Sequence, residues 1–212
     1  MKAFIFDMDG VIIDSEPIHN QVIKEFLANH GYKITDEELD RYVGMTSTSV
    51  FTILKQTYHL PTSAEELTVE HMNEFKAYIA KHHIQPIEGI KTLLTKLQQQ
   101  NIPMAIASSS PLDVIEFVAK NFAITDYFDF LISGENMPQG KPAPDIYLHT
   151  AAKLNVPPAD CVVLEDSKNG SIAAKTAGMY CIGFANPNSG NQDLSRADII
   201  VHNINDINLE NL

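Results

Sequence analysis

Short apolar runs alternate with helical patterns along the second half of the chain, and this alternation restricts the folds that the chain can adopt. The apolar runs are MAIAS (104–108), FDFLIS (128–133), CVVLE (161–165), CIGFA (181–185) and DIIVH (198–202). Helical patterns separate several of them, at 111–122, 145–155 and 169–179. Strands that are separated by helices predict a doubly wound, Rossmann-like parallel sheet with helices on both faces. The near-continuous apolar character of the runs fits strands that are buried on both sides.

Residues 16–83 follow a different pattern and contain no convincing strand. Amphipathic helical segments are predicted at 17–32, 36–43, 49–60 and 64–83. Side chains suited to helix N-caps precede three of them: Thr35, Thr46 or Ser47, and Ser63. We therefore predict a small all-helical domain at 16–83, inserted into an α/β core made of residues 1–15 and 84–212.

Acidic residues follow the first strand, in the sequence MKAFIFDMDG. Asp7 and Asp9 are separated by one residue and are followed by Gly10, which permits a tight turn. Other polar side chains also stand at or after predicted strand ends: Ser108, Lys141, Glu165 and Asp166. Because ligands of open α/β sheets bind beyond the carboxyl ends of the strands, we expect these side chains to meet at one rim.

The grouping suits phosphoryl transfer with a divalent cation. Carboxylates of Asp7, Asp166 and Glu165 would offer Mg²⁺ the oxygen ligands that it prefers. A carboxylate such as Asp7 can attack phosphorus, and Asp9 is spaced to act as general acid and base. Each residue also has a structural explanation, because acids and serines at strand ends commonly cap turns and helices. What favours a functional site is that all these residues stand together at or after the ends of predicted strands.

Composition excludes several other classes of protein. The net charge is −12 and no basic stripe is present, which argues against binding to nucleic acid. No apolar run is long enough to span a membrane, and the first residues do not resemble a signal peptide, so we expect a cytoplasmic protein. Cys161 and Cys181 lie in apolar runs and are interpreted as reduced core thiols. Nothing indicates an additional interface, which favours a monomer.

Four motifs together resemble the haloacid dehalogenase superfamily of phosphohydrolases, over nearly the whole chain. They are FDMDGVIIDSEPIH, IASSS, GKPAPDIYL and VVLEDSKNGSIAAKTAGM. The branch that the chain resembles is the β-phosphoglucomutase-like one, in which a helical cap follows the first motif. The resemblance implies a cap at 16–83, with hinges near Ser15 and Ile84 that would let it close.

The resemblance also implies roles for individual residues. Asp7 would be the nucleophile and Asp9 the general acid and base, while Ser108, Ser109 and Lys141 would bind the transferring phosphoryl group. Magnesium would be held by Asp7, the Asp9 carbonyl, Asp166 and, in the inner or outer shell, Glu165. His19 matches a histidine near the substrate, although it could also be an ordinary helix residue. Dehalogenases of the superfamily lack the second acid, so Asp9 argues against that reaction.

The cap loop RYVGMTSTSV bears on the choice between a phosphatase and a mutase. Where the mutase pattern has lysine and arginine, this chain has Val43 and Ser47. A second phosphate would therefore be held poorly, which favours a phosphatase of a small sugar or sugar-alcohol phosphate. Gly44, Thr46 and Ser47 would contribute to substrate choice, unless Thr46 or Ser47 only caps the next helix.

Two alternatives stay open from the sequence. The first is a phosphosugar mutase, because Arg41 could still reach a second phosphate. The second is a non-catalytic, phosphate-sensing domain. Receiver domains of that kind are shorter, and they lack both the helical insert and an acid two residues after the phosphorylated aspartate.

Overall fold

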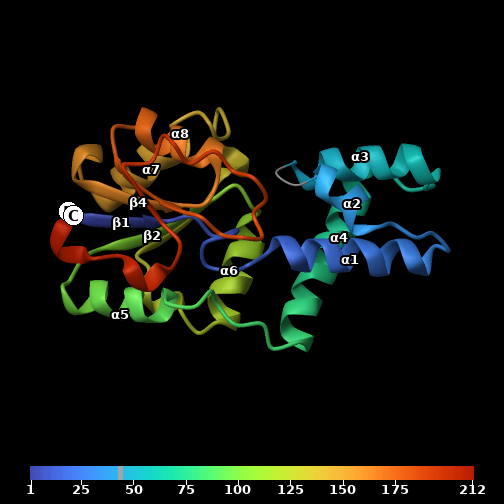
Figure 1. Ribbon diagram of the computed structural model, residues 1–212, viewed down its shortest axis with the longest axis horizontal. Coiled ribbons are helices and arrows are strands. Elements are labelled where there is room, and N and C mark those ends of the chain that lie inside the picture. The colour runs from blue at the N-terminus through green and yellow to red at the C-terminus, as the bar shows by residue number, and fades with distance from the viewer. Residues whose placement is uncertain (43–44) are drawn as a thin grey trace. The chain divides into compact units, whose positions relative to one another are not determined.

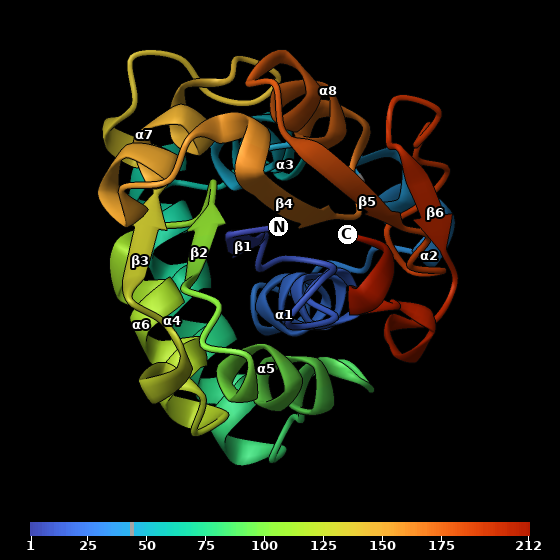
Figure 2. The ribbon, with the colours of Figure 1, turned by 90° about the vertical axis from the view of Figure 1, so that its left-hand side faces the viewer.

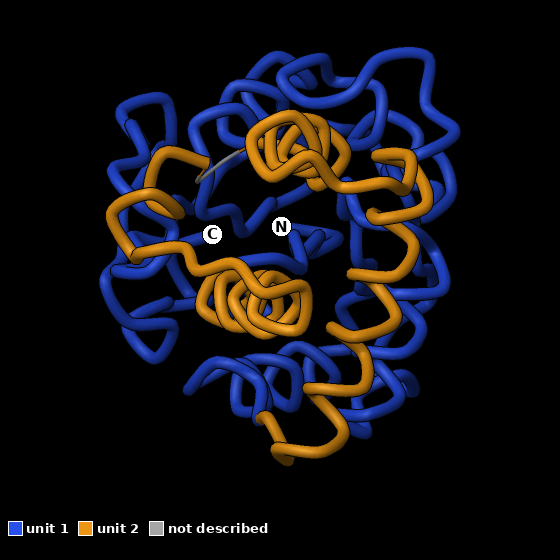
Figure 3. The backbone as a smooth tube through the Cα atoms, turned by 90° about the vertical axis from the view of Figure 1, so that its right-hand side faces the viewer, with its two compact units in different colours: residues 1–14, 85–212 blue, residues 15–84 orange. Residues whose placement is uncertain are grey.

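The computed structural model describes residues 1–42 and 45–212 and divides into two compact units. The core unit comprises residues 1–14 and 85–212, and the helical unit comprises residues 15–84 (Figure 3). We predicted Ser15 and Ile84 in the core, whereas both are grouped with the helical unit, in which each forms a backbone hydrogen bond at the end of a helix. The Ser15 carbonyl accepts from the backbone N–H of His19, and the Ile84 N–H donates to the Ile79 carbonyl.

The core unit is built on a parallel sheet of six strands in the order β3-β2-β1-β4-β5-β6. The strands are β1 (Ala3–Phe6), β2 (Met104–Ser108), β3 (Phe130–Ser133), β4 (Cys161–Glu165), β5 (Tyr180–Phe184) and β6 (Ile199–Val201). Every residue of β1, β2 and β4 is buried, as the apolar runs predicted. The doubly wound, Rossmann-like prediction is confirmed.

Helices cover both faces of this sheet (Figures 1 and 2). One face carries α7 (Asp145–Leu154) and α8 (Lys168–Thr176), and the other carries α5 (Ile90–Gln99) and α6 (Leu112–Asn121). Short 3₁₀ turns connect the elements at Thr125–Tyr127, Gly134–Asn136, Pro158–Asp160, Ile204–Asp206 and Leu209–Asn211. The two cysteines are free and buried, as expected.

Sequence reasoning missed α5 and misplaced the start of α6. Leu93, Leu94 and Leu97 of α5 are buried, and their spacing is the helical signal that was overlooked. Pro111 was expected in the first turn of α6, but it is the residue before the helix. Its φ of −54° and ψ of 145° are those of an extended cap residue.

The helical unit contains α1 (Glu16–Asn29), α2 (Asp36–Leu39), α3 (Ser47–Tyr58) and α4 (Ala64–Lys81), with a 3₁₀ turn at Asp40–Tyr42. Within the predicted segment 36–43, residues 36–42 are a single turn of α-helix followed by a 3₁₀ turn, and Val43 lies outside the described residues. The caps are Thr35, Thr46 and Ser63, whose side chains accept backbone N–H groups of the first turn. A cluster that includes Phe26, Leu27, Phe51 and Leu54 forms its apolar interior.

No strand lies within 15–42 or 45–84, as the sequence indicated. Across residues 1–42 and 45–212, no helix has the length and apolar character needed to cross a membrane.

Candidate active site

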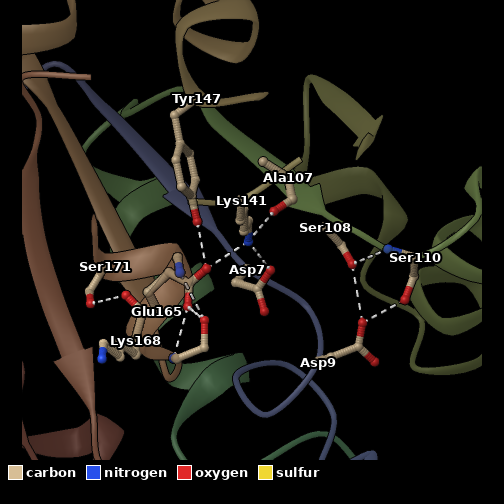
Figure 4. Close-up of polar contacts among 12 residues, drawn as sticks. Asp7, Asp9, Ala107, Ser108, Ser110, Lys141, Tyr147, Glu165, Lys168 and Ser171 are labelled. Atoms are coloured by element: carbon tan, nitrogen blue, oxygen red, sulfur yellow. Dashed lines mark hydrogen bonds and ion pairs between the residues drawn. The ribbon is translucent and has the colours of Figure 1, made fainter. Parts of the chain in front are cut away.

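The polar residues predicted at the strand ends meet at one edge of the core sheet (Figure 4). Asp7 follows β1, Ser108 ends β2, and Glu165 ends β4 with Asp166 directly after it. Because β1 lies between β2 and β4, these carboxyl ends are neighbours. Lys141 reaches the same edge from the segment between β3 and α7.

Lys141 lies between two of the carboxylates. Its Nζ is 2.6 Å from Oδ1 of Asp7 and 2.6 Å from Oε1 of Glu165. Burial lowers the pKa of Lys141, but the adjacent Asp7 and Glu165 carboxylates outweigh it and raise that pKa well above its usual value. Lys141 is therefore a permanent cation, since a buried charge persists only when paired.

Glu165 is completely buried and accepts four hydrogen bonds. Oε1 accepts from Lys141 and from the Tyr147 hydroxyl at 2.8 Å, and Oε2 accepts from the backbone N–H and hydroxyl of Ser167 at 3.0 and 2.9 Å. Burial raises its pKa, but Lys141 and these hydrogen bonds bring the pKa below its usual value. A Cβ on Gly170 would lie 1.6 Å from Oε1, so the carboxylate rests against a residue without a side chain.

Asp9 is held by two serines, the last residue of β2 and a residue of the loop after it. Its Oδ2 accepts from the Ser110 hydroxyl at 2.6 Å and from the Ser108 hydroxyl at 3.1 Å. Its Oδ1 is buried and has no hydrogen-bond partner among the described residues. Gly10 has a φ of +74° at the turn after Asp9, and a Cβ there would lie 1.9 Å from Oδ2 of Asp166. The turn thus requires glycine for both its conformation and its space.

A buried acidic cluster could hold a metal ion. One carboxylate oxygen from each of Asp7, Glu165 and Asp166 lies within 4.8 Å of the others. Burial raises the pKa of Asp7 well above its usual value, with Lys141 opposing this and the neighbouring carboxylates adding to it. Burial and Glu165 likewise raise the pKa of Asp166 to about 7, although Ser189 donates to its Oδ2. A hard divalent cation would relieve this repulsion, so the residues fit magnesium.

The three carboxylates differ in the oxygens that they can offer. Among the described contacts, Asp7 accepts through Oδ1 and Asp166 through Oδ2, which leaves a second oxygen on each for a cation. Both oxygens of Glu165 already accept two hydrogen bonds. Asp7 and Asp166 are therefore better suited to direct coordination, and Glu165 to holding Lys141 beside them.

Other predicted residues are placed differently. Ser109 is exposed, and no hydrogen bond of its side chain is found among the described residues. Thr46 is the N-cap of α3, and its hydroxyl accepts from the Ser49 N–H at 3.3 Å. Ser47 begins that helix, and His19 lies on α1; all three belong to the helical unit. Gly44 and its neighbour Val43 lie outside the described residues.

Sequence reasoning did not assign Ser110, Tyr147, Ser167 or Ser189 to the site. Ser110 was considered only as a helix cap, and Tyr147 only as part of a helix. A helical position two residues after Asp145 gives no sign that the Tyr147 hydroxyl meets Glu165, which is 18 residues away. The serine of the EDS sequence and the serine of the loop at 189 also resemble ordinary capping and loop residues.

The fold and the buried acidic cluster define a Rossmann-like α/β enzyme. Residues 4–184 match the family described as haloacid dehalogenase-like hydrolase, so the chain belongs to that family.

Several relatives of the chain are named as phosphatases. Hexitol phosphatase B of Escherichia coli K12 is 35% identical over 192 residues, which cover 89% of this chain and 86% of that protein. Beta-phosphoglucomutase of Bacillus subtilis is 32% identical over 216 residues, 99% of this chain and 93% of that one. Among solved structures, the chain is similar to a mutant of CbbY from Rhodobacter sphaeroides in complex with xylulose-(1,5)bisphosphate. The two structures superpose with a TM-score of 0.85 and 26% sequence identity, and the match covers 97% of this chain and 96% of that chain. The chain is accordingly a phosphatase of the haloacid dehalogenase type.

Proposed function

We propose that the chain is a magnesium-dependent phosphatase of small sugar or sugar-alcohol phosphates and that it acts through an aspartyl-phosphate on Asp7. The observation that carries the proposal is the placement of Asp7 beside Lys141 and Asp166, with Asp9 held two residues away by Ser108 and Ser110. The names of the relatives support the substrate class, because hexitol phosphatase B is among them.

In the first half of the reaction, a carboxylate oxygen of Asp7 forms a bond to phosphorus as the bond to the leaving oxygen breaks. Asp9 gives its proton to that oxygen, so the product leaves as a neutral alcohol. In the second half, Asp9 takes a proton from water as the water oxygen attacks the same phosphorus. The bond between Asp7 and phosphorus then breaks, which releases inorganic phosphate and restores the Asp7 carboxylate and the protonated Asp9.

The remaining residues stabilise charge. Lys141, the Ser108 hydroxyl and backbone amides after β2 would bind the non-bridging phosphoryl oxygens. Magnesium, held by Asp7, the Asp9 carbonyl and Asp166, would supply positive charge for the phosphoryl group and keep Asp7 ionised. Glu165 keeps Lys141 in place through its 2.6 Å contact, with Tyr147 and Ser167 holding the other side of the carboxylate.

A mutase needs a cationic place for a second phosphate, and this chain offers little for it. Ser47 stands where the mutase pattern has arginine, and Val43 stands where it has lysine. The phosphatase is therefore preferred over the mutase. A cytoplasmic location, a monomeric state and substrate contacts by His19, Gly44, Thr46 and Ser47 stay predictions.

The test is phosphate release from a panel of hexose 1- and 6-phosphates, hexitol phosphates, phosphoglycolate and nucleoside monophosphates, with and without magnesium. We expect release from the sugar or hexitol phosphates, lost with a chelator and in Asp7→Asn and Asp9→Asn. Asp160→Asn is the matched control, because the Asp160 carboxylate forms an exposed ion pair with Lys2.

Trapping of the phosphorylated intermediate tests the nucleophile. Acid-quenched protein should carry a phosphoryl group on the peptide that contains Asp7, and the label should be absent in Asp7→Asn. Conversion of a hexose 1-phosphate to the 6-phosphate with a bisphosphate activator, without net phosphate release, would instead make the protein a mutase. A labelled protein that never releases phosphate would favour a sensing domain.

A further inference from the structure

Two histidines form a hydrogen-bonded pair within the helical unit. Nδ1 of His19, on α1, lies 2.9 Å from Nε2 of His71, on α4. His71 is 1% exposed. Phe75 stacks on the His19 ring with 4.2 Å between centroids, and Phe51 packs against the His71 ring at 5.1 Å. Aromatic side chains therefore hold both imidazoles in fixed orientations.

Both imidazoles are neutral at pH 7. Burial lowers the pKa of His19 to about 4. Burial, with a smaller contribution from His19, lowers the pKa of His71 to about 3. No acidic or basic side chain other than the paired histidine contributes to either shift. Each ring therefore carries one N–H donor and one bare acceptor nitrogen, and a single hydrogen lies between the two rings.

The position of this hydrogen follows from the other nitrogen of His71. Nδ1 of His71 is buried and has no hydrogen-bond partner among the described residues. If His19 donated to His71, Nδ1 of His71 would be a buried N–H without an acceptor, and such donors are rare in proteins. If His71 donates, the same nitrogen is an unused lone pair, which costs less.

We propose that His71 is a positioning residue: its Nε2–H donates to Nδ1 of His19 and fixes His19 in the tautomer that carries hydrogen on Nε2. His19 then offers a neutral N–H donor with a single orientation. Such a donor suits an uncharged oxygen, such as a hydroxyl of a sugar or polyol leaving group. It adds no positive charge for a second phosphate. The substrate contact rests on the proposed function, whereas the tautomer does not.

Stability alone gives no reason for a histidine at position 71. A buried polar group without a full set of partners destabilises a fold, and an apolar residue would suit the surrounding cluster better. Local departures of this kind tend to mark functional positions. Here the unusual residue is His71, and it contacts His19, the histidine of the helical unit that is predicted to contact the substrate.

The tautomer can be observed directly in the full chain. Protein with ¹⁵N-labelled histidine is studied by NMR at pH 7, with His19→Gln and His71→Gln used to assign the ring signals. We expect Nδ1 of His19 to be unprotonated and Nε2 of both rings to carry hydrogen. A proton on Nδ1 of His19 would overturn the proposal. This measurement needs no substrate, so it separates the tautomer from the proposed function.

Kinetics test whether the orientation matters for substrate binding. His71→Leu removes the donor, and we expect KM to rise by about 3- to 10-fold with kcat within about twofold, as for loss of one hydrogen bond that binds substrate and transition state alike. His71→Gln keeps an N–H donor of similar reach and should recover most of this loss. His30→Gln is the matched control, because His30 forms a hydrogen bond with the Phe26 carbonyl of its own helix and packs against the Phe26 ring.

A purely structural role gives a different pattern. It would lower kcat through a smaller folded fraction, leave KM unchanged, and make His71→Gln no better than His71→Leu; that pattern would overturn the proposal. Thermal unfolding of each variant measures the folded fraction. If wild-type protein released no phosphate from any substrate, the proposed function would fail while the NMR result would still decide the tautomer.

Discussion

The core unit and the helical unit both bury titratable side chains, but they stabilise them in opposite ways. In the core, Lys141 contacts Asp7 and Glu165, so the buried groups are charged and paired. In the helical unit, His19 and His71 contact each other, and burial keeps them neutral. The difference shows that a chain can keep polar groups inside by compensating their charge or by removing it.

Removing the shared cation of the core should have the largest effect. Lys141→Met leaves two buried carboxylates without a partner, and we expect the free energy of unfolding to fall by about 3–5 kcal/mol, together with loss of activity. Urea denaturation measures the change. Lys2→Met, which breaks the exposed pair with Asp160, should change stability by less than about 1 kcal/mol. Equal effects of the two variants would mean that the core pairing contributes little.

A side chain placed against Glu165, the carboxylate that accepts four hydrogen bonds, should have the next largest effect among the substitutions. An alanine Cβ at Gly170 would overlap Glu165, so Gly170→Ala should destabilise the protein by about 2 kcal/mol and lower kcat as Lys141 loses its support. Gly140→Ala is the control, since a Cβ at Gly140 would meet no atom of the described residues within 4 Å and its φ is not positive. A fully active and stable Gly170→Ala would show that Glu165 can move freely.

The neutral pair predicts a specific dependence of stability on pH. The folded-state pKa values of His19 and His71 lie below the ordinary value of 6.5, so the unfolded chain binds more protons between pH 6.5 and about 4. Stability from this pair is complete above pH 6.5 and is lost as the pH falls through that window. From this pair we expect a decrease of about 4 kcal/mol in the free energy of unfolding between pH 7 and pH 5, about 2 kcal/mol for each histidine, measured by urea denaturation at each pH.

The same measurement on His71→Phe sharpens the comparison. Because this variant removes one of the two depressed pKa values, its stability should fall less over the same pH range. An unchanged slope would place the acid sensitivity elsewhere in the molecule.

The smallest expected effect concerns the serine that holds Asp9. Ser110→Ala removes a 2.6 Å hydrogen bond to Oδ2 but leaves the Ser108 contact. We expect kcat to fall by about 3- to 10-fold, equivalent to one hydrogen bond, with little change in unfolding temperature. Steady-state kinetics measure this, and Ser195→Ala on the surface serves as control. A drop of the size seen in Asp9→Asn would mean that Ser110 has a more direct role.

Much of the fold could be predicted because its signals are local. The runs at 104–108 and 161–165 coincide with β2 and β4, and Thr35 and Ser63 cap the helices that they were expected to cap. α5 was overlooked although its leucines carry a helical spacing. The predicted helix continued past Leu39, where α2 ends and a 3₁₀ turn at Asp40–Tyr42 begins, since a capping box at Thr35 marks where a helix begins but not where it ends.

The residues of the site were predictable to the extent that they stand at strand ends. Parallel strands bring their carboxyl ends to one edge, so Asp7, Ser108 and Glu165 could be grouped before any contact was known. Ser109 shows the limit of this reasoning: it is adjacent to Ser108, yet its side chain is exposed. Adjacent residues at the end of a strand point in different directions, and the sequence does not tell which of them turns inward.

The sequence by itself determined the alternation that builds the sheet, the acids that follow β1 and β4, and the glycine that lets Asp9 turn. Only the tertiary structure decided which partners these residues have. Ser110 meets Asp9 across 101 positions of chain, and His71 meets His19 across 52. Such contacts depend on how separate elements pack, and no local pattern encodes them, because a side chain's hydrogen-bond partner is set by proximity in space rather than by spacing along the chain.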